Sequence, residues 1–140
     1  MLVPVDGSAS STDALAMACF LAKKNKGTVY AVYVIEVARN LALDADLSQD
    51  AERAEEILSQ AEHVAGSLDY KVSGEILQAR DWGHAVVDEA IERGVEAIVM
   101  GASDRRAPGE DQLGRMAQYV VNHAPCRVVI CRPPFAGSAK

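Results

Sequence analysis

Two short loops carry residue types that suit the binding of a small polar ligand. Residues 6–8 (DGS) follow an apolar segment at residues 2–5, and residues 101–104 (GASD) follow another at residues 95–100. Both loops are rich in small polar residues, whose backbone and side chains can approach a ligand closely. In an open parallel sheet, ligands bind beyond the carboxyl ends of the strands, where the strand order reverses. The sequence therefore predicts a ligand site at these loops.

Other residues with chemical potential are isolated along the chain. His63, His84 and His123 lie far apart, and none stands beside a recognisable nucleophile, so we interpret all three as structural or solvated. The chain contains no GxGxxG motif, no Walker lysine and no metal-binding signature. We therefore predict no catalytic residue and no metal site.

Five short segments rich in β-branched residues could form the strands that place these loops. They are residues 2–5, 28–35, 70–77, 95–100 and 127–131. Segments with a helical period of apolar residues lie between them, which gives the order β-α-β-α-β-α-β-α-β. This alternation is typical of a parallel sheet with helices on both faces. We expect one domain at residues 1–135 and a disordered tail at residues 136–140.

Capping residues mark the ends of the predicted helices. Ser10, Ser11 and Asp13 can supply the cap and the first-turn acid of the first helix. Residues 47–68 are predicted to form a long amphipathic helix with an acidic outer face. Asp81 and Gly94 bound a third helix at residues 82–93. A fourth follows Asp111. The positions predicted to face inward in the last two helices include Val86, Val87, Ala90, Ile91, Leu113, Met116, Ala117, Val120 and Val121.

The two ends of the chain resemble a known family. Residues 100–132 (MGASDRRAPGEDQLGRMAQYVVNHAPCRVVICR) resemble the C-terminal signature of the universal stress protein family, and residues 2–8 (LVPVDGS) resemble its opening strand and loop. The resemblance implies a flavodoxin-like, adenine-nucleotide-hydrolase-like α/β sheet of order 3-2-1-4-5. It also implies a homodimer that pairs the fifth strands, here residues 127–131, since an exposed apolar edge needs covering. A protected sheet edge is the alternative.

Some members of this family bind ATP through the pattern G-x2-G-x9-G-[S/T], which this chain keeps only in part. Gly101 and Gly114 match the first and third glycines, whereas Asp104 replaces the second glycine and Arg115 replaces the hydroxyl residue. A carboxylate about 4 Å from a phosphate charge costs ~1 kcal/mol in water and ~4 kcal/mol at an effective dielectric near 20. Arg115 would attract phosphate or pair with Asp104. The residues expected at this end of the site are Gly101, Ala102, Asp104, Gly114, Arg115 and Met116.

The adenosine end of the family site is better kept. Pro4, Val5 and Asp6 match first-strand positions, and the resemblance places Asp6 at the ribose or the adenine edge. Val34 and Met100 match apolar positions around the base. Each has another interpretation: Val34 and Met100 as ordinary core residues, and Asp6 as part of a turn that caps the following helix.

From these features we expect a non-catalytic, dimerising universal stress protein domain that binds AMP more readily than ATP. Two alternatives stay open. The chain could be a cytosolic regulatory domain of a membrane transporter, because the first strand begins at residue 2, or it could hydrolyse ATP slowly with Asp104 as the base. A signalling partner is compatible with each.

The composition of the chain bears on its cellular location and on the classes of partner that it can bind. The chain has 140 residues, with 14 basic and 20 acidic side chains, and a net charge of −6 argues against binding nucleic acid or anionic lipid. No apolar run reaches the ~18 residues of a membrane span. The three cysteines, Cys19, Cys126 and Cys131, fit no zinc spacing and are expected to be buried and reduced in a cytoplasmic protein.

Overall fold

The computed structural model describes residues 1–37, 48–102 and 115–132, and only the backbone of residues 115 and 116. Within these residues, five strands and four helices alternate in the order that the sequence predicts. The strands are β1 (Leu2–Pro4), β2 (Val29–Glu36), β3 (Val72–Ala79), β4 (Ala97–Gly101) and β5 (Arg127–Cys131). The helices are α1 (Ala9–Asn25), α2 (Ser48–Ser67), α3 (Trp82–Arg93) and α4 (Arg115–His123).

All five strands form one parallel sheet in the order β3-β2-β1-β4-β5, which confirms the expected order. The chain first adds strands on one side of β1 and then crosses to the other, so the order reverses between β1 and β4. Leu2 of β1 pairs with Tyr30 of β2 on one side and with Ile98 of β4 on the other. The carboxyl ends of these three strands therefore frame the switch point at which ligands bind in such sheets.

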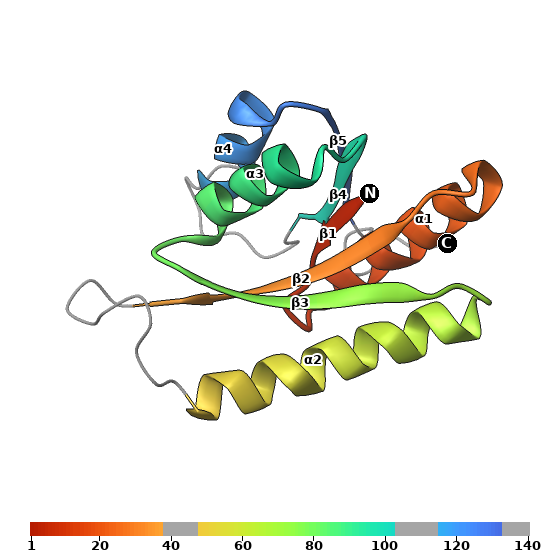
Figure 1. The fold of residues 1–140 in the computed structure, drawn as a ribbon, viewed down its shortest axis with the longest axis horizontal. Helices are drawn as coiled ribbons and strands as arrows, with labels where there is room; N and C mark the ends of the chain where they lie inside the picture. Colours follow the sequence, from red (N-terminus) through yellow and green to blue (C-terminus); the bar gives the residue numbers. More distant parts are fainter. Residues whose placement is uncertain (38–47, 103–114, 133–140) are drawn as a thin grey trace, which may run out of the picture.

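The helices form a layer on each face of the sheet (Figure 1). One apolar cluster joins α1 and α2 to the sheet through buried residues such as Val3 and Val99. A second cluster joins α3 and α4 to the opposite face through Leu2, Ile98 and Met100. Neighbouring residues of a strand thus belong to different clusters, because successive side chains point to opposite faces. Burial on both faces explains why the strands lack a polar side in the sequence.

The helix boundaries confirm some capping predictions and correct others. Asp81 caps α3 by accepting a hydrogen bond from the His84 N–H, and Gly94 ends that helix in the left-handed conformation, as predicted. The N-cap of α1 is Ser8, whose side chain accepts from the Ser11 N–H. Ser10, Ser11 and Asp13 lie inside the helix, whose first turn holds no acidic residue, so the assignments of these three were wrong. The cap comes earlier because the turn after β1 needs only Val5, Asp6 and Gly7.

Other positions also differ from the sequence predictions. β3 begins two residues later than expected, since Asp69 has a φ of 58° and the chain is still turning there. Ile91 and Val121 are 59% and 45% exposed, although both were predicted to face inward. They lie at the margins of the apolar stripes of α3 and α4. The predictions for Asp111, Leu113 and the tail at residues 136–140 lie outside the described residues.

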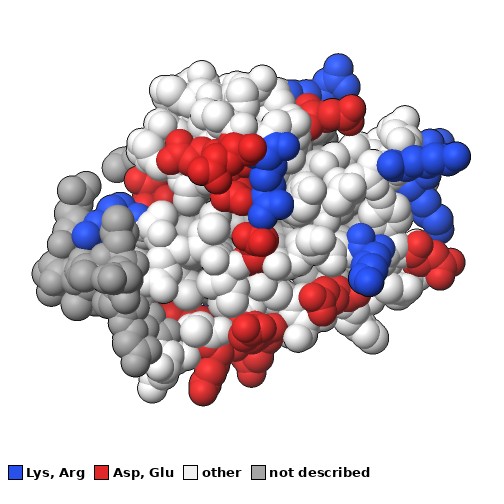
Figure 2. Space-filling model, in the orientation of Figure 1, with Lys and Arg blue, Asp and Glu red and all other residues white. Residues whose placement is uncertain are grey.

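Acidic side chains gather along the edge of the molecule where α2 lies, and basic ones lie near the end of α1 (Figure 2). Among the described helices, none has the length and apolar character to cross a membrane. The three cysteines are free; Cys19 is buried, but Cys126 and Cys131 are half-buried, so the expected burial of these two was wrong. Burial raises the pKa of all three thiols, which keeps them protonated at neutral pH.

Candidate functional site

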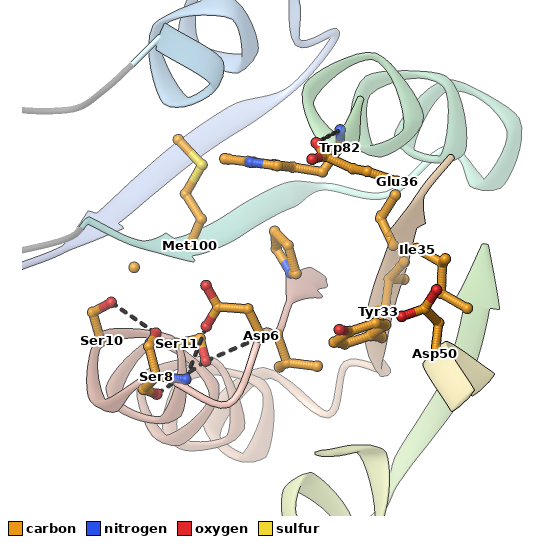
Figure 3. A pocket seen from close by; sticks show the side chains of 15 residues that line it. Asp6, Ser8, Ser10, Ser11, Tyr33, Ile35, Glu36, Asp50, Trp82 and Met100 are labelled. Carbon is orange, nitrogen blue, oxygen red and sulfur yellow. Dashed lines mark hydrogen bonds between the residues drawn. The ribbon is translucent and has the colours of Figure 1, made fainter. Parts of the chain in front are cut away.

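A cavity of about 360 Å³ opens at the carboxyl ends of β1, β2 and β4 (Figure 3). Its volume lies in the range of small-molecule sites. The residues that line it are Pro4, Val5, Asp6, Ser8, Ser10, Ser11, Val32, Tyr33, Val34, Ile35, Glu36, Asp50, Trp82, Met100 and Gly101. The cavity therefore lies at the switch point of the sheet, where the two loops identified in the sequence begin.

Six of the residues singled out in the sequence line this cavity together: Pro4, Val5, Asp6, Val34, Met100 and Gly101. Ala102 does not; it is buried, and its N–H donates to the Cys131 carbonyl at 2.9 Å, which extends the pairing of β4 with β5. Asp104 and Gly114 lie outside the described residues. The backbone of Arg115 and Met116 begins the described part of α4, and their side chains are not described.

The β1–α1 turn supplies one wall of the cavity through a network of local hydrogen bonds. Gly7 has a φ of +85°, a backbone conformation that residues other than glycine rarely adopt. An Asp6 carboxylate oxygen accepts from the Ser8 N–H at 2.9 Å, and the Asp6 N–H donates to the Ser11 hydroxyl at 3.3 Å. Asp6 therefore does shape the turn before α1, as one of its two interpretations held, and it also faces the cavity (Figure 3).

Gly101 allows a close approach between β4 and α1. A Cβ atom at this position would lie 2.4 Å from the carbonyl carbon and oxygen of Ser10. Such distances are sterically forbidden, so any side chain would push α1 away from the sheet. The need for glycine at the first position of the ATP-binding pattern thus has a packing reason in this chain, whether or not a phosphate lies nearby.

The β3–α3 turn supplies the opposite wall, which the sequence analysis did not anticipate. Trp82 is the first residue of α3 and lines the cavity half-buried. Its backbone N–H donates to a carboxylate oxygen of Glu36, the last residue of β2, at 2.9 Å. Trp82 was not among the site residues predicted from the sequence. Its place three residues after the end of a strand, next to a helix cap, was the signal that could have assigned it to the site.

The cavity combines apolar walls with hydroxyl and carboxylate groups. Strand-end side chains, Met100 and Trp82 give it apolar and aromatic surface, whereas Ser8 and Ser10 present hydroxyls. Asp6, Glu36 and Asp50 are its only charged side chains among the described lining residues. Apolar surface with a few fixed polar groups suits an uncharged ring that carries hydroxyls. Within residues 1–37, 48–102 and 117–132, no group of three His, Cys, Asp or Glu side chains could hold a metal ion.

The fold defines a doubly wound α/β protein, and its cavity lies at the switch point of the sheet. The family model described as "Universal stress protein family" matches residues 1–132. The chain belongs to this family. A curated universal stress protein of Methanocaldococcus jannaschii is 28% identical over 140 residues, which cover 96% of this chain and 82% of that protein.

Solved structures agree with this assignment. The universal stress protein UspA from Lactobacillus plantarum is 29% identical with a TM-score of 0.77, covering 94% of this chain and 95% of that one. A universal stress protein from Archaeoglobus fulgidus in complex with dAMP is 23% identical, with a TM-score of 0.75 and coverage of 93% and 94%. An Arabidopsis thaliana family member with AMP bound is 14% identical, with a TM-score of 0.64 and coverage of 99% and 94%. At these identities the last two show the shared fold.

Proposed function

We propose that this chain is a nucleotide-binding universal stress protein that holds an adenylate in the switch-point cavity. The observation that carries the proposal is the convergence of Pro4, Val5, Asp6, Val34, Met100 and Gly101 on one cavity of about 360 Å³. The first five match positions that the family resemblance places around adenosine, and Gly101 matches the first glycine of the ATP-binding pattern. Relatives of the same fold were solved with dAMP and with AMP, which supports a nucleotide of this class as the ligand.

The described lining favours the nucleoside part of the ligand over a chain of phosphates. Apolar strand ends suit a base, and the carboxylate of Asp6 with the hydroxyls of Ser8 and Ser10 suits a ribose. The charged side chains of the described lining are all carboxylates, which repel phosphates. At the phosphate end of the family pattern, Asp104 and Arg115 depart from the usual residues. We therefore propose AMP as a better ligand than ATP, and a binding role rather than a catalytic one.

Isothermal titration calorimetry with adenosine, AMP and ATP tests this proposal. We expect dissociation constants below millimolar for AMP and weaker binding of ATP. The double change Asp104→Gly with Arg115→Ser restores the family pattern and should strengthen ATP binding while leaving adenosine binding unchanged. If wild-type protein binds no adenylate below millimolar, the proposed function is wrong. If the double variant binds ATP as the wild type does, the explanation of the phosphate preference is wrong.

We further propose that two copies pair through β5. This strand is at the edge of the sheet, and Val128, Val129 and Ile130 remain half-buried in the single chain. Such an apolar edge exposes unpaired backbone groups that a second β5 can satisfy. A Val129→Lys variant should be monomeric in light scattering, whereas Ile91→Lys on the exposed side of α3 should remain dimeric. A dimeric, folded Val129→Lys protein would place the interface elsewhere.

We propose a cytoplasmic location for this protein, which its family membership and its three free thiols support.

A further inference from the structure

We propose that Trp82 is the base-stacking wall of the cavity and that it sets a preference for purines. This inference rests on the proposed function, because it assigns a residue to the recognition of the adenylate base. The family's ATP-binding pattern does not include the first residue of α3. The assignment therefore comes from the arrangement of the cavity itself.

The position of the ring suits stacking. Trp82 lines the cavity and, like Val34, packs against the buried apolar cluster that contains Met100. In Figure 3 its indole extends across the cavity toward Met100, on the side opposite Asp6 and Ser8. A flat ring that enters this space meets the indole on one side, and the hydroxyls and carboxylate of the β1–α1 turn lie on the other. This arrangement matches the two halves of a nucleoside.

Two carboxylates from different elements fix the start of α3 and hence the backbone position from which the indole extends. Glu36 accepts a hydrogen bond from the backbone N–H of Trp82 at 2.9 Å, and Asp81 accepts one from the backbone N–H of His84 at 2.8 Å. Glu36 lies 46 residues before Trp82, so its bond ties α3 to the carboxyl end of β2. A ring held in place before binding loses little freedom when a base stacks on it. Glu36 is thus a positioning residue for the stacking wall.

The chemistry of an indole face explains the expected selectivity. Stacking on an aromatic side chain tolerates any flat base, and its strength grows with the area of overlap, so a purine gains more than a pyrimidine. The carboxylates around the cavity do not oppose an uncharged base, although they oppose added phosphates. Trp82 should therefore affect binding of the base and not of the ribose phosphate.

Trp82 is the only tryptophan of the chain, so selectively excited tryptophan fluorescence observes this residue alone. We expect adenosine and AMP to change its emission on binding. By calorimetry, Trp82→Ala should weaken adenosine and AMP binding about tenfold and reduce the preference for AMP over CMP, whereas Trp82→Phe should lose about threefold or less. Ribose 5-phosphate should bind wild type and Trp82→Ala equally. Ile91→Ala, an exposed position on the same helix, is the matched control and should bind AMP as the wild type does.

The outcomes separate this inference from the proposed function. If wild-type protein binds AMP and folded Trp82→Ala binds it equally well, with the same ratio of AMP to CMP, the stacking role is wrong and the proposed function stands. An equal loss of ribose 5-phosphate and AMP binding would show a general loss of the cavity and would also overturn the stacking role. If wild-type protein binds neither adenosine nor AMP, both proposals fail.

Discussion

The two strand-to-helix turns that wall the cavity are built differently. In the β1–α1 turn, Asp6, Ser8 and Ser11 bond to one another within a segment of six residues. In the β3–α3 turn, Asp81 provides a local cap, but the first N–H of the helix is satisfied by Glu36 from another strand. One wall is therefore determined by its own short sequence, and the other depends on the correct alignment of two strands.

The difference matters because each wall is proposed to meet a different half of the ligand. The local turn presents hydroxyl and carboxylate groups, and the turn tied to β2 presents an aromatic ring. A substitution in the polar wall, formed by Asp6, Ser8 and Ser11, should mainly alter the conformation of that turn. The position of the aromatic wall, formed by Trp82, should also respond to substitutions in β2 or β3. The register that pairs Glu36 with Ala79 sets the distance between Glu36 and α3.

The largest loss of stability is expected from a substitution at Gly101, where β4 packs closely against the start of α1. Gly101→Ala would place a Cβ atom 2.4 Å from the Ser10 backbone, so α1 must move. Overpacking of this kind costs typically 1–3 kcal/mol, and because backbone atoms are involved we expect about 3 kcal/mol of lost unfolding free energy in urea denaturation. Gly66→Ala in α2 is the control. Nothing lies within 4 Å of its Cβ, so it should be neutral or slightly stabilising. Equal stability of the two variants would contradict the close packing.

Local signals made much of this structure predictable. The limits of α3 followed from Asp81 and Gly94, a capping carboxylate and a glycine that adopts the left-handed conformation. The limits of β5 also followed from the sequence, since Pro133 and Pro134 lie just beyond its run of β-branched residues. The switch point indicated the loops that hold Asp6 and Gly101, and the family resemblance supplied Pro4, Val5, Val34 and Met100. The contact of Glu36 with Trp82 was not predictable, because it joins residues 46 apart and depends on the register of β2 against β3.

Removal of the two helix caps should have a smaller effect and should distinguish the two walls. Ser8→Ala and Asp81→Ala each remove a side chain that accepts from a first-turn N–H, which costs about 1 kcal/mol. Only Asp81→Ala should also change the emission of Trp82, because it loosens the helix that carries the indole. Ser8→Thr and Asp81→Asn keep a capping oxygen and serve as controls. Similar emission changes in both alanine variants would show that the two turns are not independent.

The smallest effect on stability, and the most specific one, is expected at Glu36. Its bond to the Trp82 N–H lies at the exposed margin of the cavity, so Glu36→Ala should cost only about 0.5 kcal/mol, at the low end for a hydrogen bond. The same change should shift Trp82 emission and weaken AMP binding about threefold, because the indole is no longer held before the base arrives. Glu36→Gln keeps an oxygen that can accept this bond and should behave nearly as the wild type in both measurements. If Glu36→Gln weakens AMP binding as much as Glu36→Ala, then the charge of Glu36 acts directly on the ligand, and the aromatic wall does not depend on this contact.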